Sequence, residues 1–396
     1  MSAGVLSVYI FLTVLITTRW VGLAEAGMVS FAAAVAVLVN GIITFNVRIF
    51  QSSDVGKEFS LHTYLGLRIC TALLSVIFIA SFVLVGNFDT QRLIVILLFY
   101  LMFLCTGFAD VFMGDLQQKT KMRVAGRIMV CSFGLNLIVF AFTIFVSGSL
   151  IISLISSCIV TFFSYVAWIW FYRNDFGPIR VRYDISAIKI LLKKVLPLFF
   201  AGLIGSYLYN MQKYYLGFLE TDESVATITI LLMPGTALQM LCAAIFGGAE
   251  MTKTAVIYAS GNLKSLSKRI NGQLLAAVAI SIFFLLCVYI FGLPLLAWLF
   301  ATELSTYMLE LMIVSIGGAL FSVNIALGSA AIVMRLQKAH FIITLVVAVI
   351  VAPLMWVIVA RYGINGAAFT NLAFLAPLSI ALYVICRVKV RKLASQ

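Results

Sequence analysis

The sequence predicts an all-α polytopic membrane protein with twelve transmembrane helices in two six-helix lobes. Hydrophobic residues make up 63% of the 396 residues and charged residues only 10%, whereas a soluble globular protein is about half apolar and about a quarter charged. The apolar residues occur in twelve long runs, each near the ~20 residues that a helix needs to cross the hydrocarbon core. A membrane-barrel strand needs only about ten residues of alternating polarity, so the runs predict helices.

The twelve runs are separated by charged or turn-rich segments. They cover residues 4–20, 27–47, 65–86, 93–113, 127–147, 150–172, 195–218, 226–247, 271–293, 306–330, 341–361 and 366–386. No basic segment precedes the first run and the second follows at once, so we expect an uncleaved helix and not a signal peptide.

The longest polar break follows the sixth run and divides the chain into two halves. The predicted division is a lobe at 1–172, a cytoplasmic linker at 173–194, a second lobe at 195–387 and a basic tail at 388–396. Short acidic loops, GLAEAG and LETDES, precede the second and the eighth runs. This weak internal symmetry is typical of transporters built from two repeats.

The basic residues that give the net charge of +13 are distributed in agreement with the predicted topology. With the N-terminus inside, all but four of the 27 Lys and Arg residues lie in the connections after even-numbered helices or in the tail. Basic residues are retained on the cytoplasmic side of membrane proteins, so both termini are predicted to be cytoplasmic. Such charges would contact anionic membrane lipids, and no nucleic-acid partner is expected.

Enzymatic chemistry is not supported by the sequence. No predicted outer loop exceeds about a dozen residues, which leaves no room for an external catalytic domain, and both histidines, His62 and His340, fall on the cytoplasmic side. The seven cysteines lie in or at the ends of apolar runs without metal-ligand spacing. We therefore expect no catalytic residue, no metal site and no cofactor.

Polar residues form stripes on three of the predicted helices. Asn40, Thr44 and Arg48 follow at i, i+4 and i+8 in and just beyond the second run. Thr106 and Asp110 share a face of the fourth. Charge facing lipid costs ~2.5–3.5 kcal/mol or more at mid-membrane, so such stripes are expected to face protein or a watery cavity. Arg48 could also be an interface anchor, but its place in the stripe and the absence of a partner nearer than Asp54 favour a functional role. Asp110 could pair with a basic residue of segment 115–127.

The seventh run contains one charged residue, Lys213. Ser206 and Asn210 lie on the same helical face. Two positions of the Lys213 ammonium remain open. It lies roughly 9 Å from the outer end of the run at 1.5 Å per residue, so it could extend to the interface, or it could line a cavity. The aligned Asn210 and Ser206 favour the cavity.

Five stretches spread over the whole chain carry a family resemblance: TRWVGLAEAGMVSFAAAV, VRIFQSSDVGKEFSLHTYLGLR, ADVFMGDLQQKTKMRVAGR, NMQKYYLGF and IVMRLQKAHFIITLVVAVIVAPLMWVIVARYGINGAA. In their order and spacing they resemble the Wzx-like polysaccharide flippases of the multidrug/oligosaccharidyl-lipid/polysaccharide exporter superfamily. Many members carry an Asp-Arg pair where this chain has Gln212-Lys213. A carboxylate role is therefore in doubt there, while the positive charge is retained.

The resemblance implies movement of an undecaprenyl-pyrophosphate-linked oligosaccharide, such as an O-antigen or lipopolysaccharide precursor, across the bacterial inner membrane by alternating access. It also implies coupling to an ion gradient, with H⁺ or Na⁺ as the candidate ion. A polysaccharide polymerase and glycosyltransferases become candidate partners. Lys213 and Arg48 are the candidates to meet the diphosphate. Asn40, Ser206, Asn210 and Tyr209 are candidates for sugar hydroxyls, and Asp110 is a coupling or structural charge.

Two other transporter functions stay open. A drug or cation antiporter of the related multidrug branch would need buried carboxylates, and only Asp110 qualifies. A lipid II flippase would share most of the chemistry but commonly has helices beyond twelve.

Overall fold

The computed structural model describes residues 2–54, 58–176 and 184–394. Within these ranges the chain forms sixteen α-helices and one π-helical turn, with no strand. Ten of these helices are long and apolar enough to cross a membrane, and α1 is a shorter apolar helix. The predicted seventh run lies in α9. Each of the twelve predicted runs thus falls on a helix, and the all-α, multi-pass fold class is confirmed.

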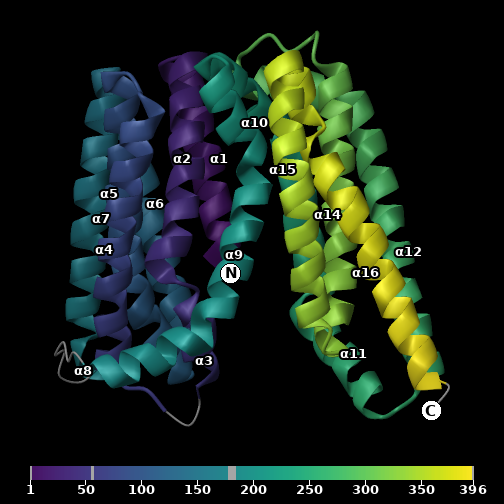
Figure 1. Cartoon of the computed structure of the whole chain (residues 1–396). Coiled ribbons are helices and arrows are strands. Elements are labelled where there is room, and N and C mark those ends of the chain that lie inside the picture. The colour runs from purple at the N-terminus through teal and green to yellow at the C-terminus, as the bar shows by residue number, and fades with distance from the viewer. Residues whose placement is uncertain (1, 55–57, 177–183, 395–396) are drawn as a thin grey trace. The chain divides into compact units, whose positions relative to one another are not determined.

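Residues 1–207 form the first of two compact units, which contains the purple and blue helices of Figure 1. Its helices are α1 (Ser2–Trp20), α2 (Leu23–Thr44), α3 (Val47–Ser53), α4 (Leu61–Gly86), α5 (Thr90–Gln118), α6 (Met122–Ser147), α7 (Leu150–Phe171), α8 (Arg173–Phe176) and the first part of α9 (Ile185–Leu219). A two-residue interruption of the helical conformation, at Phe45 and Asn46, separates the short α3 from α2.

Residues 208–396 form the second unit. It contains the end of α9 and the green and yellow elements of Figure 1. These are α10 (Asp222–Phe246), α11 (Gly248–Ala259), α12 (Leu263–Cys287), the π-turn η1 (Val288–Gly292), α13 (Leu293–Phe300), α14 (Met308–Val333), α15 (Gln337–Ala368) and α16 (Thr370–Ala394).

The boundary between the units falls inside α9, after Tyr207. The predicted linker at 173–194 instead contains α8 and the beginning of α9, and its residues 177–183 lie outside the described ranges. The first part of α9 packs on the first unit, since Leu191, Val195 and Phe199 join its hydrophobic core. The functional division into two lobes and a linker stays a prediction.

Several helices begin at a side chain that caps their free backbone N–H groups. The hydroxyl oxygens of Ser60, Ser149 and Thr221 accept from the backbone N–H three residues later, at the starts of α4, α7 and α10. The Asp89 carboxylate does the same for α5. These local signals determine where the chain enters four of the predicted spans.

One central helix of small residues is buried in each unit. In α2, 78% of the most apolar stretch is buried, against 22% in α4; in α14 the share is 67%. Small side chains let neighbouring helices approach closely, as is common in membrane proteins. A Cβ built on Gly318 of α14 would lie 2.6 Å from the Cα of Gly235 in α10. The two backbones therefore nearly touch at this point.

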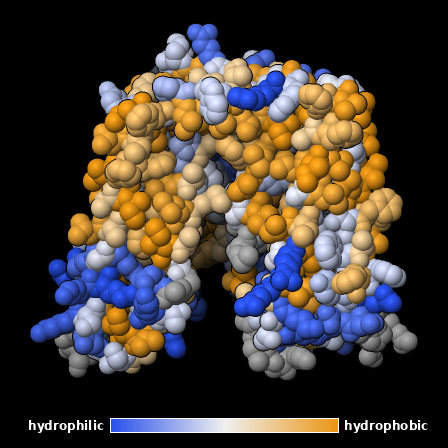
Figure 2. All heavy atoms as spheres, turned by 180° about the vertical axis from the view of Figure 1, so that it is seen from behind, coloured by the Kyte–Doolittle hydropathy of each residue, from blue (hydrophilic) through white to orange (hydrophobic). Residues whose placement is uncertain are grey.

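Apolar side chains cover the flanks of each unit. Figure 2 shows them in orange, with hydrophilic side chains gathered toward the ends of the helices. Residues such as Leu84, Phe145, Phe283 and Trp298 are more than two-thirds exposed. An apolar surface of this extent requires lipid as its surroundings, in agreement with a multi-pass membrane protein.

Candidate functional site

The site begins where the helical conformation is interrupted between α2 and α3. Phe45 and Asn46 both adopt left-handed backbone conformations, with φ of 50° and 51°. Such conformations are costly for residues with a side chain, although Asn tolerates them. Packing offsets the cost for Phe45, whose ring stacks on that of Phe199 at 3.9 Å between centroids. The Asn46 amide donates to the carbonyl of Leu198 at 2.9 Å. The break turns the chain before α3.

The break leaves backbone carbonyls of the last turn of α2 without partners in the helix. The carbonyl of Ile43 instead accepts from the Arg68 guanidinium and from the Thr71 hydroxyl, the latter at 2.7 Å. Both donors lie on α4 and are buried. The C-terminal end of a helix carries partial negative charge, so a guanidinium is a suitable partner there.

The same arginine takes part in an ionic cluster. The Asp110 carboxylate of α5 accepts from Arg48 of α3 at 2.9 Å and from Arg68 at 3.4 Å. Arg48 also donates through Nε to Gln117 Oε1 at 3.1 Å. The side chain of Arg68 is 1% exposed, whereas those of Arg48 and Asp110 are 17% and 16% exposed. Two guanidinium groups share one carboxylate, so the cluster carries one positive charge in excess.

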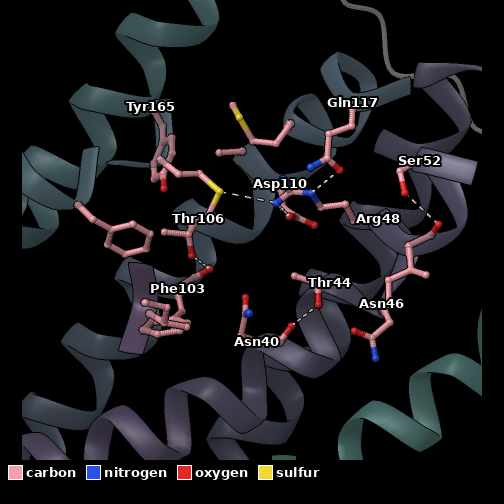
Figure 3. A pocket seen from close by; sticks show the side chains of 16 residues that line it. Asn40, Thr44, Asn46, Arg48, Ser52, Phe103, Thr106, Asp110, Gln117 and Tyr165 are labelled. Atoms are coloured by element: carbon pink, nitrogen blue, oxygen red, sulfur yellow. Dashed lines mark hydrogen bonds and ion pairs between the residues drawn. The ribbon is translucent and has the colours of Figure 1, made fainter. Parts of the chain in front are cut away.

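The cluster forms part of the wall of a cavity of about 510 Å³ in the first unit. Proteins bind small molecules in cavities of roughly 300–1,000 Å³. In Figure 3, Asn40, Tyr165 and the Arg48–Asp110 pair extend toward a common space from four different helices. The polar residues that line it are Asn40, Thr44, Asn46, Arg48, Ser52, Thr106, Asp110, Gln117 and Tyr165. The cavity therefore offers neutral amides and hydroxyls beside the Arg48–Asp110 pair, and Arg68 behind this pair makes that wall cationic.

Three predicted site residues, Asn40, Arg48 and Asp110, meet at this cavity. Two alternatives that the sequence left open, a partner for Arg48 at Asp54 and a partner for Asp110 in segment 115–127, are not seen. Arg48 pairs with Asp110 and not with Asp54, which accepts from the backbone of Glu58 and Phe59 and from the Tyr64 hydroxyl. Asp110 in turn binds arginines of α3 and α4 and no basic residue of segment 115–127. The break after α2 is the reason, because it places Arg48 on a separate helix beside α5.

The structure also corrects the placement of Arg68. It belongs to the predicted run 65–86 but is also counted among the basic residues of the connection before that run; in the structure it lies in the second turn of α4 with 2% of its surface exposed. A signal was available in the sequence, since Ser60 is a good helix cap and the helix that it starts includes Arg68. Gln117 and Tyr165 were also missed, because a lone polar residue on an apolar helix does not reveal its partner.

The predicted residues of α9 are not among the described residues that line this cavity. Tyr209 of the second unit shares a hydrogen bond of 3.2 Å with the Thr236 hydroxyl and makes an edge contact with Phe321. Asn210 is buried, and Ser206 lies at the end of the first unit. Lys213 is partly exposed. Its role stays a prediction.

A metal site has no support in the described part of the chain. There, no three His, Cys, Asp or Glu side chains gather closely enough to hold an ion.

The fold is that of the MATE transporters of the MOP superfamily. An inward-facing multidrug resistance MATE transporter matches with a TM-score of 0.73 at 16% identity, over 98% of this chain and 95% of its own. The eukaryotic MATE transporter AtDTX14 matches with a TM-score of 0.65 at 15% identity, over 98% and 94%. A MOP superfamily transporter from Pyrococcus furiosus, described as having a binding pocket of reverse polarity, gives 0.54 at 16% identity, over 99% and 94%.

A more particular likeness is seen in sequence. The capsular polysaccharide biosynthesis protein CapF of Staphylococcus aureus is 23% identical over 370 residues, which cover 91% of this chain and 90% of CapF. No family model matches the sequence.

Proposed function

We propose that this protein is a flippase that moves an undecaprenyl-pyrophosphate-linked oligosaccharide from the inner to the outer leaflet by alternating access, for the synthesis of a surface polysaccharide. The observation that carries the proposal is the cationic wall of the cavity in the first unit. Two arginines share one carboxylate there, which favours an anionic cargo. The likeness to CapF, a capsular polysaccharide biosynthesis protein, supports the same cargo class.

Arg48 is the residue proposed to bind the diphosphate. A guanidinium binds phosphate oxygens through two parallel N–H donors, and Arg48 is the more accessible of the two arginines. Gln117 Oε1 accepts from its Nε, and its Nη1 donates to Asp110 Oδ1 at 2.9 Å. The Asp110 carboxylate thus accepts from one terminal nitrogen of Arg48, and an arriving phosphate group would compete for that donor.

Arg68 is proposed to position the carboxylate. Its side chain is almost fully buried and bonds both Asp110 and the carbonyl of Ile43. Arg68 therefore links Asp110 to the C-terminal end of α2, and its burial keeps it from contacting a ligand. The net positive charge of the wall depends on Arg68 even though Arg48 makes the contact.

The neutral polar groups are proposed to bind sugar hydroxyls. Asn40, Thr44, Thr106 and Tyr165 line the cavity, and amides and hydroxyls can both donate to and accept from a sugar. Such groups replace the water that the polar head of the cargo leaves behind, which would otherwise cost several kcal/mol per polar group. Lys213 with Ser206, Tyr209 and Asn210 is retained as a second proposed set of contacts to the same cargo.

The alternative function is a drug or cation antiporter of the multidrug branch. It is favoured by the partly exposed carboxylate of Asp110 in the cavity and by the fold likeness to a multidrug MATE transporter. A cationic drug would have to displace two arginines from that carboxylate. Lipid II transport would also require a cationic site for a diphosphate, and it differs from the main proposal in the sugar.

The decisive experiment is complementation of a deletion strain. The strain is expected to accumulate lipid-linked oligosaccharide on the cytoplasmic leaflet and to lose surface polysaccharide. The wild-type chain should abolish the accumulation and restore the surface polysaccharide. Arg48→Gln should fail although it inserts normally, whereas Arg48→Lys should restore part of the activity because it keeps the charge without the two-donor geometry.

The control is Arg123→Gln, which removes an exposed arginine from α6 of the same unit. It should restore the polysaccharide fully. Wild-type rescue by Arg48→Gln would overturn the site assignment. Normal surface polysaccharide in the deletion strain, together with increased sensitivity to cationic drugs, would establish the antiporter instead.

A further inference from the structure

A second polar site lies in the second unit, where the beginning of α12 crosses the end of α16. Ser267 and Asn271 of α12 and Tyr383 and Arg387 of α16 line a small cleft there. Apolar side chains of both helices, Ile270, Cys386 and Val390, form the rest of its wall. The cleft therefore combines hydrogen-bond donors with apolar surface.

The guanidinium of Arg387 is held in place at this cleft. Its Nε donates to the Tyr383 hydroxyl at 3.0 Å, and its carbon lies 5.1 Å from the centre of the Tyr383 ring. These contacts use one edge of the guanidinium and leave the terminal nitrogens available to an acceptor. Tyr383 thus orients a donor pair that suits a phosphate group.

Positive charge around the cleft has no acidic partner on its own helices. Lys264 and Lys268 lie one turn apart on α12, and Arg391 follows Arg387 by one turn on α16. Neither helix contains Asp or Glu. The nearby Glu250 of α11 is already bound by Lys253 at 2.9 Å and by Arg269. Glu310 begins α14, whose opposite end packs here through Ala330, Ala331 and Met334.

We propose that this cleft binds the phosphodiester headgroup of an anionic glycerophospholipid, independently of the transported cargo. Arg387 lines the cleft, and Lys264, Lys268 and Arg391 lie within two turns of its lining residues, at the polar beginning of α12 and the polar end of α16. Hydrophilic side chains gather at this end of the unit, at the lower left in Figure 2. Basic pockets between membrane helices at the interface are suited to anionic headgroups.

The size of the cleft determines how the headgroup binds. Its volume of about 10 Å³ is close to that of one water-sized probe. A single phosphate oxygen can enter, bonded by Arg387 and Ser267 or Asn271, while the acyl chains lie along the exposed apolar flanks. Ile380, Val384 and Val388 provide such a flank on α16, being 66%, 50% and 45% exposed. A lipid satisfies both the polar and the apolar parts of this surface, unlike a free phosphate ion.

The test uses the purified full chain, delipidated in a neutral detergent. Phosphatidylglycerol and phosphatidylcholine with identical acyl chains are titrated in turn, and bound lipid is counted by native mass spectrometry. We expect the first phosphatidylglycerol to bind at least fivefold more tightly than phosphatidylcholine. Arg387→Gln should weaken it about fivefold, the ratio that corresponds to about 1 kcal/mol per basic residue. Lys268→Gln should act in the same direction and, being exposed, should not disturb folding.

Two further variants distinguish binding at this cleft from nonspecific attraction by the positive charge of the surface. Tyr383→Phe keeps every charge but removes the hydroxyl that orients Arg387, and it should weaken phosphatidylglycerol binding two- to fivefold. Lys389→Gln removes the same charge from another face of α16 and should change binding less than twofold. Equal losses in Arg387→Gln and Lys389→Gln, or equal binding of both lipids by the wild type, would overturn the proposal. Competition by glycerol 3-phosphate at equimolar concentration would also overturn it, since the acyl chains would then be unnecessary.

Discussion

Replacing Asp110 with Asn should destabilise the first unit by leaving Arg68 buried without a counter-charge. At an effective dielectric constant of about 20, unit charges 3.4 Å and 2.9 Å apart attract by roughly 5 and 6 kcal/mol. Desolvation offsets much of this, and removing one partner of a buried pair typically costs ~3–5 kcal/mol. Because Asp110 and Arg48 are 16–17% exposed and Asn can still accept one hydrogen bond, we expect about 2–3 kcal/mol.

Thermal unfolding of the purified protein in detergent measures this effect. For a unit of about 200 residues, each kcal/mol lowers Tm by about 2–4 °C, so Asp110→Asn should lower it by about 4–12 °C. The pairing itself is measured by a double-mutant cycle with Arg68→Gln. The double variant should be more stable than the sum of the two single losses predicts, by at least 1 kcal/mol, because the uncompensated charge is gone. Strictly additive losses would refute the reasoning.

Three further predictions concern stability, each measured by the same unfolding assay. Thr71→Val removes the hydroxyl bond to the carbonyl of Ile43 and should cost about 1 kcal/mol; an unchanged Tm would mean that Arg68 satisfies that carbonyl alone. Gly318→Ala should destabilise by more than about 2 kcal/mol, because its methyl group would meet Gly235. The matched Gly272→Ala, where nothing lies within 4 Å, should stabilise by up to about 1 kcal/mol; equal effects would contradict the close packing of α10 on α14. The pKa of Glu250 lies below its ordinary value of 4.5, because Lys253 donates a hydrogen bond to its carboxylate and the positive charge of Arg269 stabilises the ionised form. Its contribution is therefore present above pH 4.5 and lost as the pH falls through the lowered pKa, so below pH 4.5 wild type should lose more stability than Glu250→Gln, and parallel curves would disprove this.

The helices on which the twelve runs fall could be predicted because hydropathy is a local property. An apolar run of sufficient length must be helical in lipid, since each backbone N–H and C=O group needs a partner within the same segment. Start signals such as Ser60 and Thr221 are equally local. The face shared by Thr106 and Asp110 was also predictable, because residues four apart on one helix stay together whatever surrounds them, and both line the cavity.

The sequence could not predict which charged side chains form ion pairs with one another. Arg48 and Asp110 are separated by 62 residues, and Arg68 and Asp110 by 42, so only the packing of α3 and α4 against α5 brings them together. The turn at Phe45 and Asn46 depends on the same packing, since stacking on Phe199, more than 150 residues later, offsets its backbone cost. Sequence alone therefore determined that this is a bundle of membrane helices with polar stripes. Tertiary structure decided which stripes meet and what net charge they present, because ion pairing depends on distances across helices while hydropathy depends only on the residues within one.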